Sequence, residues 1–244
     1  MIRLDALLAR NLGCSKTAAA ALLAAGRVRD ESGQVLTDRR RAIDEAALPL
    51  PVNVDGARRA LVAEAHVLLN KPTGVVTALR DPVHRTAYEL VRSAPLYGEL
   101  RPVGRLDMDT TGLLLWTSDG AWVSRLTHPK HAVPRTYEVA LARPHRPLPQ
   151  ALVLDGGHRP RIQALSALAR EGAHPSLQAP PEAAAFATIT VVGGAYHEVR
   201  RIFAALGSHV LGLCRVGFGR LTLPRELPLG RFISVDVRQA ISTC

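Results

Sequence analysis

The spacing of apolar residues near the N-terminus predicts two short helices followed by a hairpin. Leucines recur on one helical face over residues 3–11, and a glycine then ends the segment. Ser15 is a good N-cap for a second helix over 16–26, which is rich in alanine and leucine and ends in glycine. Residues 27–38 form two short alternating segments around the turn sequence ESG, a pattern typical of a β-hairpin.

The rest of the chain alternates irregularly between strand-like and helix-like segments. Residues 44–62 contain two prolines and no useful period, so we expect an irregular linker there and a domain boundary near residue 60. Predicted strands cover 66–72, 74–79, 112–117, 136–141 and 185–193, and predicted helices cover 86–94, 120–128 and 196–207. Seven prolines within 143–182 predict a variable excursion. The fold class expected is α+β.

Composition narrows the class of protein. With 244 residues and 47% hydrophobic residues the chain can bury a proper core. Its apolar runs stay short of the ~18 residues that a membrane helix needs, and its charged start does not resemble a signal peptide. Three cysteines without CxxC spacing support neither a disulfide framework nor a zinc site. We therefore expect a soluble, cytoplasmic protein.

The charge favours a polyanionic partner. The chain carries 31 basic and 21 acidic residues, a net charge of +10. Only Lys16, Lys71 and Lys130 are lysines, so 28 of the 31 basic residues are arginines, whose planar guanidinium groups suit phosphate contacts and base stacking. This composition predicts a nucleic-acid partner, although a GC-rich coding bias would produce the same excess of arginine.

The loop before the predicted strand 112–117 contains the best candidate for catalysis. Arg105 stands two residues before Asp107, and in an extended loop both side chains project to the same side, where the guanidinium would keep the carboxylate ionised. A surface turn with a satisfied acid is the alternative. The histidines lack metal-ligand spacing, and the sequence contains neither a phosphate-binding loop nor a nucleophile elbow. An enzyme built on these residues would use an aspartate and neither a metal nor a cofactor.

The first fifth of the chain resembles the S4 RNA-binding domain. The matching sequences are RLD at 3–5, SK at 15–16 and GRV at 26–28, with a lengthened turn in the hairpin. The alternative is a helix and hairpin cap whose charges are only solvated. The resemblance implies an RNA-binding surface formed by Arg3, Arg10, Lys16, Arg27 and Arg29.

Four further blocks resemble the RsuA-type rRNA pseudouridine synthases. In chain order they are LLNKPTGVV (68–76), GRLDMDTTG (104–112), PRTYEV (134–139) and YHEVRRIFAALGSHV (196–210). The chain departs from the family at 193–198, where GGAYHE replaces the usual EG-x-YHQ. The resemblance implies an S4-like domain over 1–60 and a catalytic domain over 61–244, built on a mixed, mainly antiparallel sheet flanked by helices.

The family's residue roles carry over to matching positions. Asp107 would cleave the glycosidic bond, Tyr137 would lie against the base, and Arg200 would pair with Asp107. Three further residues would bind the substrate, namely Arg105, Lys71 and Arg201. No metal or cofactor is implied.

The resemblance also implies a substrate. The DPVHRT stretch (81–86) and the D-T-T-G-L loop look more like the small-subunit enzyme, so the expected target is one uridine of 16S rRNA, equivalent to uridine 516, in a partly assembled subunit. A uridine of 23S rRNA is the runner-up, and a non-catalytic rRNA-binding assembly factor is a third possibility. No exposed heptad pattern suggests a dimer, so we expect a monomer.

Overall fold

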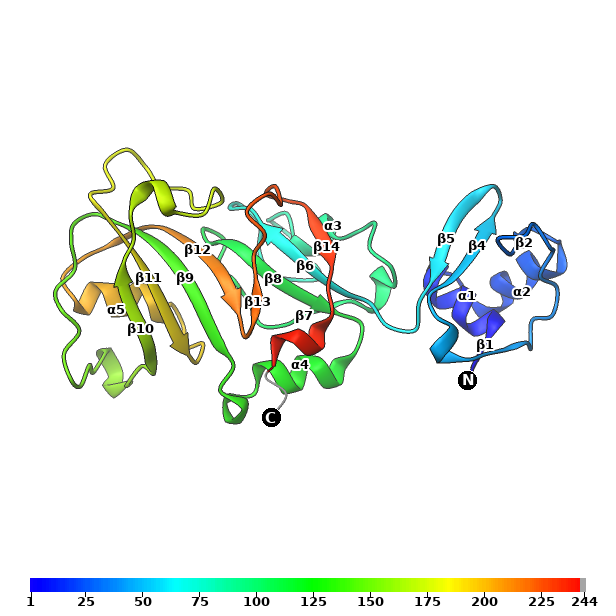
Figure 1. Ribbon diagram of the computed structural model, residues 1–244, viewed down its shortest axis with the longest axis horizontal. Coiled ribbons are helices and arrows are strands. Elements are labelled where there is room, and N and C mark those ends of the chain that lie inside the picture. The colour runs from blue at the N-terminus through cyan, green and yellow to red at the C-terminus, as the bar shows by residue number, and fades with distance from the viewer. Residues whose placement is uncertain (242–244) are drawn as a thin grey trace. The chain divides into compact units, whose positions relative to one another are not determined.

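The computed structural model describes residues 1–241, which form two compact units (Figure 1). The N-terminal unit comprises Met1–Ala65 together with Arg92–Leu100. The C-terminal unit comprises His66–Val91 and the chain from Arg101 onward. The division falls at Ala65 rather than near residue 60, and the return of residues 92–100 to the first unit had no counterpart in the sequence pattern.

Two helices and a small sheet make up the N-terminal unit. The predicted helices are confirmed as α1 and α2, and the Ser15 hydroxyl caps α2 by accepting the Ala18 N–H at 3.1 Å. Leucines of both helices pack with valines of the strands in one apolar core. The elements are β1 (Ile2–Arg3), α1 (Leu4–Leu12), α2 (Lys16–Ala24), β2 (Val28–Arg29), β3 (Ala42–Ile43), η1 (Glu45–Ala47), β4 (Leu50–Val54) and β5 (Ala57–Leu61).

The expectation of an irregular linker over 44–62 was wrong. β4 and β5 form an antiparallel hairpin there, and β2 pairs with β4. The hairpin predicted over 27–38 is reduced to a single bridge between Arg29 and Val35. The missed signal is the pair Asp55-Gly56, both with positive φ, because Asp-Gly between alternating apolar residues favours a tight hairpin turn.

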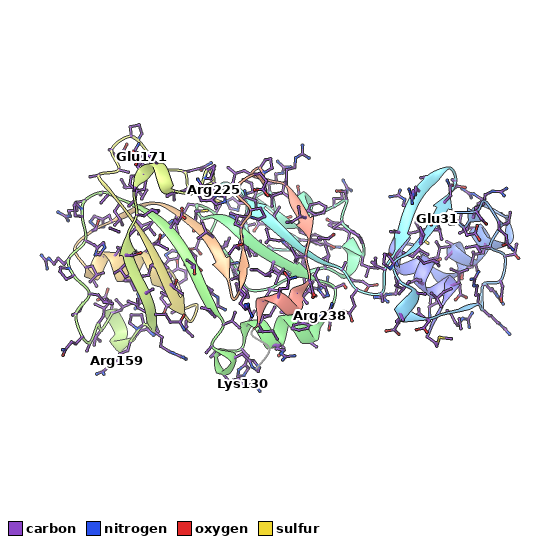
Figure 2. The ribbon with its side chains drawn as sticks, in the orientation of Figure 1. Glu31, Lys130, Arg159, Glu171, Arg225 and Arg238 are labelled. Carbon is purple, nitrogen blue, oxygen red and sulfur yellow. The ribbon has the colours of Figure 1, made fainter. Side chains whose placement is uncertain are left out.

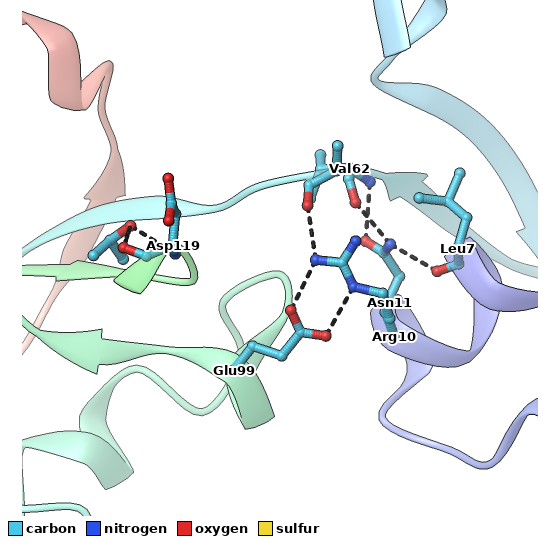
Figure 3. A network of polar contacts seen from close by, with 8 residues as sticks. Leu7, Arg10, Asn11, Val62, Glu99 and Asp119 are labelled. Carbon is cyan, nitrogen blue, oxygen red and sulfur yellow. Dashed lines mark hydrogen bonds and ion pairs between the residues drawn. The ribbon is translucent and has the colours of Figure 1, made fainter. Parts of the chain in front are cut away.

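A polar network joins α1 to the later segment of the same unit. The Arg10 guanidinium donates two hydrogen bonds to the Glu99 carboxylate, at 2.9 and 2.8 Å, and a third to the Ala63 carbonyl (Figure 3). The neighbouring Asn11 amide donates to Leu7 and Val62 carbonyls and accepts the Val62 N–H. The contacts of Arg10 with Glu99 hold residues 92–100 against α1, and those of Asn11 with Val62 hold the end of the β5 segment there.

One nine-stranded sheet organises the C-terminal unit, with its main path in the order β10-β11-β9-β12-β8-β6-β14. Its pairs are antiparallel except β8 with β12, which run parallel. The strands are β6 (His66–Lys71), β7 (Arg101–Pro102), β8 (Thr111–Thr117), β9 (Pro134–Leu141), β10 (Ile162–Ala167), β11 (Ala185–Val192), β12 (Val210–Phe218), β13 (Leu221–Thr222) and β14 (Phe232–Ser234). The helices are α3 (Ala87–Leu90), α4 (Gly120–Thr127) and α5 (Glu198–Ala205), with 3-10 turns η3 (Pro129–His131), η4 (Asp155–Gly157), η5 (Arg170–Gly172) and η6 (Val237–Ala240). A further 3-10 turn, η2 (Tyr97–Glu99), belongs to the segment that returns to the N-terminal unit.

The mixed α+β fold is thus confirmed, with four of the five predicted strands and all three predicted helices of this part of the chain. Residues 74–79 do not form a strand, and Val76 contributes only an isolated bridge to Thr86. The excursion over 143–182 contains the edge strand β10 and two 3-10 turns. The central strand β12 was not predicted.

Apolar packing holds α5 to the sheet. Its Val199, Ile202 and Phe203 are buried against residues of β9, β11 and β12. The other large cluster contains Leu126 of α4 and residues of β8 and β12. No helix among residues 1–241 is long and apolar enough to cross a membrane. The described cysteines are free, and burial raises the pKa of the Cys214 thiol to about 12, whereas Cys244 lies outside the described residues.

A glycine permits the parallel pairing at the centre of this sheet. Gly112 of β8 lies beside Arg215 of β12, with a φ of +104°. A Cβ atom at this position would lie 2.4 Å from the Arg215 carbonyl oxygen and 2.8 Å from its nitrogen. Any side chain would therefore force the two central strands apart.

Substitution of Gly112 should destabilise the C-terminal unit. We expect Gly112→Ala to lower the free energy of unfolding by about 3 kcal/mol, because the added methyl group overlaps backbone atoms. Gly230→Ala is the matched control: its φ is +78° but its Cβ would meet nothing within 4 Å, so only about 1 to 2 kcal/mol of backbone strain applies. Urea unfolding followed by the fluorescence of Trp116 and Trp122 measures both. Equal losses would contradict the proposed overlap.

Candidate active site

A buried lysine holds the loop that carries Asp107 through hydrogen bonds to its backbone. Lys71 ends β6 and is fully buried. Its ammonium group donates to the carbonyls of Pro72, Asp107 and Thr110, each at 2.9 Å, and to that of Met108 at 3.4 Å. Three of these four carbonyls belong to the loop itself, so one positive charge fixes the backbone on which Asp107 stands.

Three further hydrogen bonds hold Leu106 and Met108 of the same loop. The Thr77 hydroxyl donates to the Leu106 carbonyl at 2.8 Å and accepts the Leu106 N–H at 3.2 Å. The Gly74 N–H donates to the Met108 carbonyl at 2.9 Å. Residues 74–79 were expected to form a strand. They form none, and their hydrogen bonds stabilise the conformation of this loop instead.

The sheet places a row of functional side chains on its neighbouring strands. Tyr137 of β9 pairs with Arg215 of β12, Arg215 pairs with Gly112 of β8, and Gly112 pairs with Lys71 of β6. Directly paired residues project to the same face of a sheet. This row therefore brings together residues that lie up to 144 positions apart in sequence (215 − 71).

Beside this row lies a cavity of 790 Å³ in the C-terminal unit. The lining comes from the loop at 104–110, from η3 and its flanks, from β9 and β12, and from the turn that leads into α5. Its charged and aromatic members include Arg105, Asp107, Arg135, Tyr137, Arg161, Tyr196, His197, Glu198, Arg200 and Arg215. Five arginines against two carboxylates make the cavity suited to an anionic ligand.

Asp107 is half-buried and its carboxylate faces a histidine. The Asp107 Oδ2 atom lies 3.6 Å from Nε2 of His197, a contact that becomes an ion pair when the imidazole is protonated. Arg105 lines the cavity and is exposed, but it forms no ion pair with Asp107 in the described chain. The expected electrostatic support by Arg105 is therefore replaced by His197.

The expected pairing of Arg200 with Asp107 was wrong. The Arg200 Nη2 atom lies 2.8 Å from Oδ2 of Asp109, and its Nη1 donates to the Val210 carbonyl at 3.3 Å. Both aspartates belong to the same loop, and the loop conformation presents Asp109 to the guanidinium. Arg200 still lines the cavity.

Two residues expected to bind substrate lie elsewhere. The four carbonyls that surround Lys71 and its complete burial leave its ammonium group no access to a ligand. Arg201 does not line the cavity, and its guanidinium donates to the Asp155 carbonyl. Helix periodicity explains the second case, because consecutive residues of α5 face different directions.

Sequence reasoning missed three charged residues at the cavity: Glu198 and Arg215, which are buried, and Arg135, which is half-buried. Glu198 accepts a hydrogen bond from Nε2 of His158 at 2.8 Å, and its other oxygen has no partner in the described structure. Arg215 is almost completely buried, donates through Nε to the Leu113 carbonyl at 2.8 Å, and leaves Nη2 without a partner there. Burial lowers the pKa of Arg135, whose guanidinium contacts the carbonyls of Val133 and Gly193.

The unpaired polar atoms indicate that the cavity receives a polar ligand. Four residues of its lining contain a buried side-chain atom without a hydrogen bond in the described structure, namely Thr110, Glu198, Arg200 and Arg215. Leaving a buried polar atom unpaired costs about 1–3 kcal/mol, so a ligand with matching donors and acceptors would recover that free energy. Among residues 1–241, no three His, Cys, Asp or Glu side chains are grouped to hold a metal ion.

The ionisation of Lys71 should be measurable because the chain contains only three lysines. Burial lowers the pKa of its amine to about 8, although the carboxylates of Asp109 and Asp107 oppose this. NMR of the protein labelled with ¹³C at lysine Cε should show one signal that titrates near pH 8 and disappears in Lys71→Met. Absence of a signal titrating well below 10.5 would contradict the burial of the charge.

The sign of the effect on stability follows. Above pH 8 the folded chain has lost this proton, whereas an unfolded lysine holds it up to its ordinary value of 10.5. The unfolded state then binds more protons, so the contribution of Lys71 to the free energy of unfolding rises with pH across this window.

Comparison with known proteins identifies the family. Residues 65–205, more than half of the chain, match the family model described as RNA pseudouridylate synthase. A ribosomal small subunit pseudouridine synthase A from Yersinia pestis is 33% identical over 242 residues, which covers 99% of this chain and 97% of that protein. The protein of the same name from Vibrio cholerae is 34% identical over 239 residues and covers 95% and 94% of the two chains.

A solved structure agrees over the whole chain. A crystal structure of a pseudouridylate synthase matches with a TM-score of 0.58 at 27% identity, and the match covers 99% of this chain and 100% of that one. The matched family region includes the Asp107 loop, β9 and α5, which form much of the cavity. The chain therefore belongs to the RNA pseudouridylate synthase family.

Proposed function

We propose that this protein isomerises one uridine of small-subunit ribosomal RNA to pseudouridine. The observation that carries the proposal is Asp107 on the wall of an arginine-rich cavity, in a chain of this family. Relatives from Yersinia pestis and Vibrio cholerae are named ribosomal small subunit pseudouridine synthases, and they align over nearly their full length. These two facts favour rRNA as substrate over other RNAs.

The chemistry fits a site built from a carboxylate and no redox group. The bond between uracil N1 and the sugar C1′ breaks, the base turns, and a bond forms between C5 and C1′. The hydrogen at C5 leaves and N1 gains a proton, so the reaction is an isomerisation. The uridine must leave the helical stack to reach the cavity, at a cost of about a few kcal/mol that contacts in the cavity would offset.

The geometry supports distinct roles for the residues around Asp107. Asp107 would act on the glycosidic bond, and Tyr137, at the cavity wall beside Arg215, would lie against the base. Arg200 would position the loop through its ion pair with Asp109. Arg105, which is exposed at the cavity, would contact the RNA strand.

The N-terminal unit, as an S4-like domain, would bind the RNA through phosphate contacts that are largely independent of sequence. Three of its expected RNA-binding arginines form internal ion pairs: Arg3 with Asp5, Arg10 with Glu99, and Arg27 with Asp55. Lys16 and Arg29 are exposed and form no ion pair in the described chain. The exposed turn 39–41 adds three arginines that form no close ion pair in that same part of the chain.

The proposed target is the uridine of 16S rRNA equivalent to position 516, in a partly assembled subunit in the cytoplasm. The names of the relatives support the small subunit. A target in 23S rRNA or a non-catalytic role in assembly would appear as different outcomes of the experiments below.

Removal of the Asp107 charge should abolish turnover and spare binding. With 16S rRNA tritiated at uridine C5, Asp107→Asn should release tritium ~10⁴-fold or more slowly than wild type, because the essential carboxylate is lost. Affinity for the RNA should change by less than about three-fold, since a carboxylate makes no phosphate contact. Glu171→Gln, at a surface position labelled in Figure 2, is the charge-matched control. Retained activity in Asp107→Asn would exclude the assigned role.

Loss of the unpaired cations of the N-terminal unit should weaken the salt dependence of binding. For the double variant Lys16→Gln/Arg29→Gln, the slope of log K against log salt should fall by about 1.4–1.8, the value for two lost phosphate contacts. The control, Arg225→Gln/Arg231→Gln, removes two exposed charges from the C-terminal unit. Figure 2 labels the first of them. Equal slopes of log K against log salt for both double variants would contradict a specific role of the N-terminal unit in binding RNA.

A further inference from the structure

A stacked aromatic pair stands exposed at the cavity. The rings of Tyr196 and His197 lie 3.8 Å apart between centroids, with an angle of 17° between their planes. Tyr196 is 78% exposed, and its phenol oxygen forms no hydrogen bond within residues 1–241. An aromatic ring of this exposure contributes little to the apolar core, so its position calls for an explanation outside folding.

The pair is anchored next to the reactive carboxylate. His197 is the N-cap of α5 and adopts a left-handed conformation, with φ of 50° and ψ of 33°. A residue with a side chain rarely adopts such a conformation, so the surrounding structure must impose it. In this position Nε2 of His197 lies 3.6 Å from Asp107, and Tyr196 covers the ring of His197.

The charges around the pair suit a strand of RNA. Tyr196 and His197 line the same cavity as the exposed side chains of Arg105 and Arg161. Cationic groups that bind a phosphodiester chain, placed beside an exposed aromatic face, are typical of sites where an unstacked base lies on an aromatic ring. Both components are present within one cavity lining.

We infer that Tyr196, supported by His197, is the stacking surface for the base adjacent to the target uridine. This inference rests on the proposed function. When the uridine leaves the stack, the neighbouring base loses a stacking partner. The phenol ring replaces that partner at the entrance to the cavity, which holds the RNA open while the uridine occupies the site next to Asp107.

The test compares a variant of Tyr196 that loses the aromatic ring with one that loses only the hydroxyl group. On an RNA that the wild-type protein modifies, Tyr196→Ala should lower kcat/KM about ten-fold, the size expected from loss of one base–aromatic stack. Tyr196→Phe should remain within about two-fold of wild type, because the ring is kept. Leu148→Ala, a partly exposed apolar position outside the cavity lining, is the control for surface truncation and should also remain near wild type.

A fluorescence readout separates stacking from a structural role. The substrate carries 2-aminopurine on either the 5′ or the 3′ side of the target uridine, and Asp107→Asn holds it without turnover. Binding should change the fluorescence of one of the two probes, and adding Tyr196→Ala should remove that change. A normal kcat/KM for Tyr196→Ala, equal losses for Tyr196→Ala and Tyr196→Phe, or an unaltered fluorescence change would each overturn the inference. Failure of the wild-type protein to modify any rRNA would overturn the proposed function itself, and the inference with it.

Discussion

The buried ammonium group of Lys71 is the contact on which the candidate site depends. Removing a positive charge from water is expensive, and four backbone carbonyls together with the nearby charges of Asp107 and Asp109 offset that cost. Because three of those carbonyls belong to the loop at 107–110, the same bonds that stabilise the charge also fix the loop. The carboxylate of Asp107 is thereby held at the cavity wall by a buried cation that does not itself line the cavity.

The sheet fixes the positions of the other residues of the site relative to this loop. Lys71, Gly112, Arg215 and Tyr137 occupy paired positions on neighbouring strands, so their separation is set by strand spacing rather than by flexible loops. The parallel approach of β8 and β12 requires a residue without a side chain at Gly112. Helix α5 then packs across this face through its apolar residues and carries His197, Glu198 and Arg200 to the cavity. The strands and the helix that form the apolar core therefore also carry the residues of the candidate site.

The sequence predicted the position of the reactive loop better than its contacts. The resemblance to the pseudouridine synthases assigned Asp107, Tyr137 and Arg200 to one site, and all three line the same cavity. Pairing of Arg200 with Asp109 rather than Asp107 depends on the turn geometry of a loop with two aspartates, which no periodicity encodes. Lys71 was expected to bind the substrate. Its burial could not be predicted because it depends on how β6 pairs with strands that are distant in sequence.

Other differences have equally local causes. The hairpin of β4 and β5 was missed although Asp55-Gly56 is a strong turn signal, because two prolines and a run of arginines obscured the alternation. Strand β12 was missed because it contains two glycines and Arg215, a charged residue that does not fit an apolar strand pattern. The exposed ring of Tyr196 has no role in the core, and the site beside it accounts for its placement.

The central claim is that this cavity modifies one uridine of the small subunit. Carbodiimide treatment followed by primer extension maps pseudouridines along both rRNAs, and it should be applied to naked and protein-bound 16S and 23S rRNA that lack modifications, after incubation with the protein. One new stop in 16S rRNA is the predicted result. A stop confined to 23S rRNA would contradict the assigned target, and no stop in any rRNA, with RNA binding preserved, would contradict the claim that the cavity is catalytic.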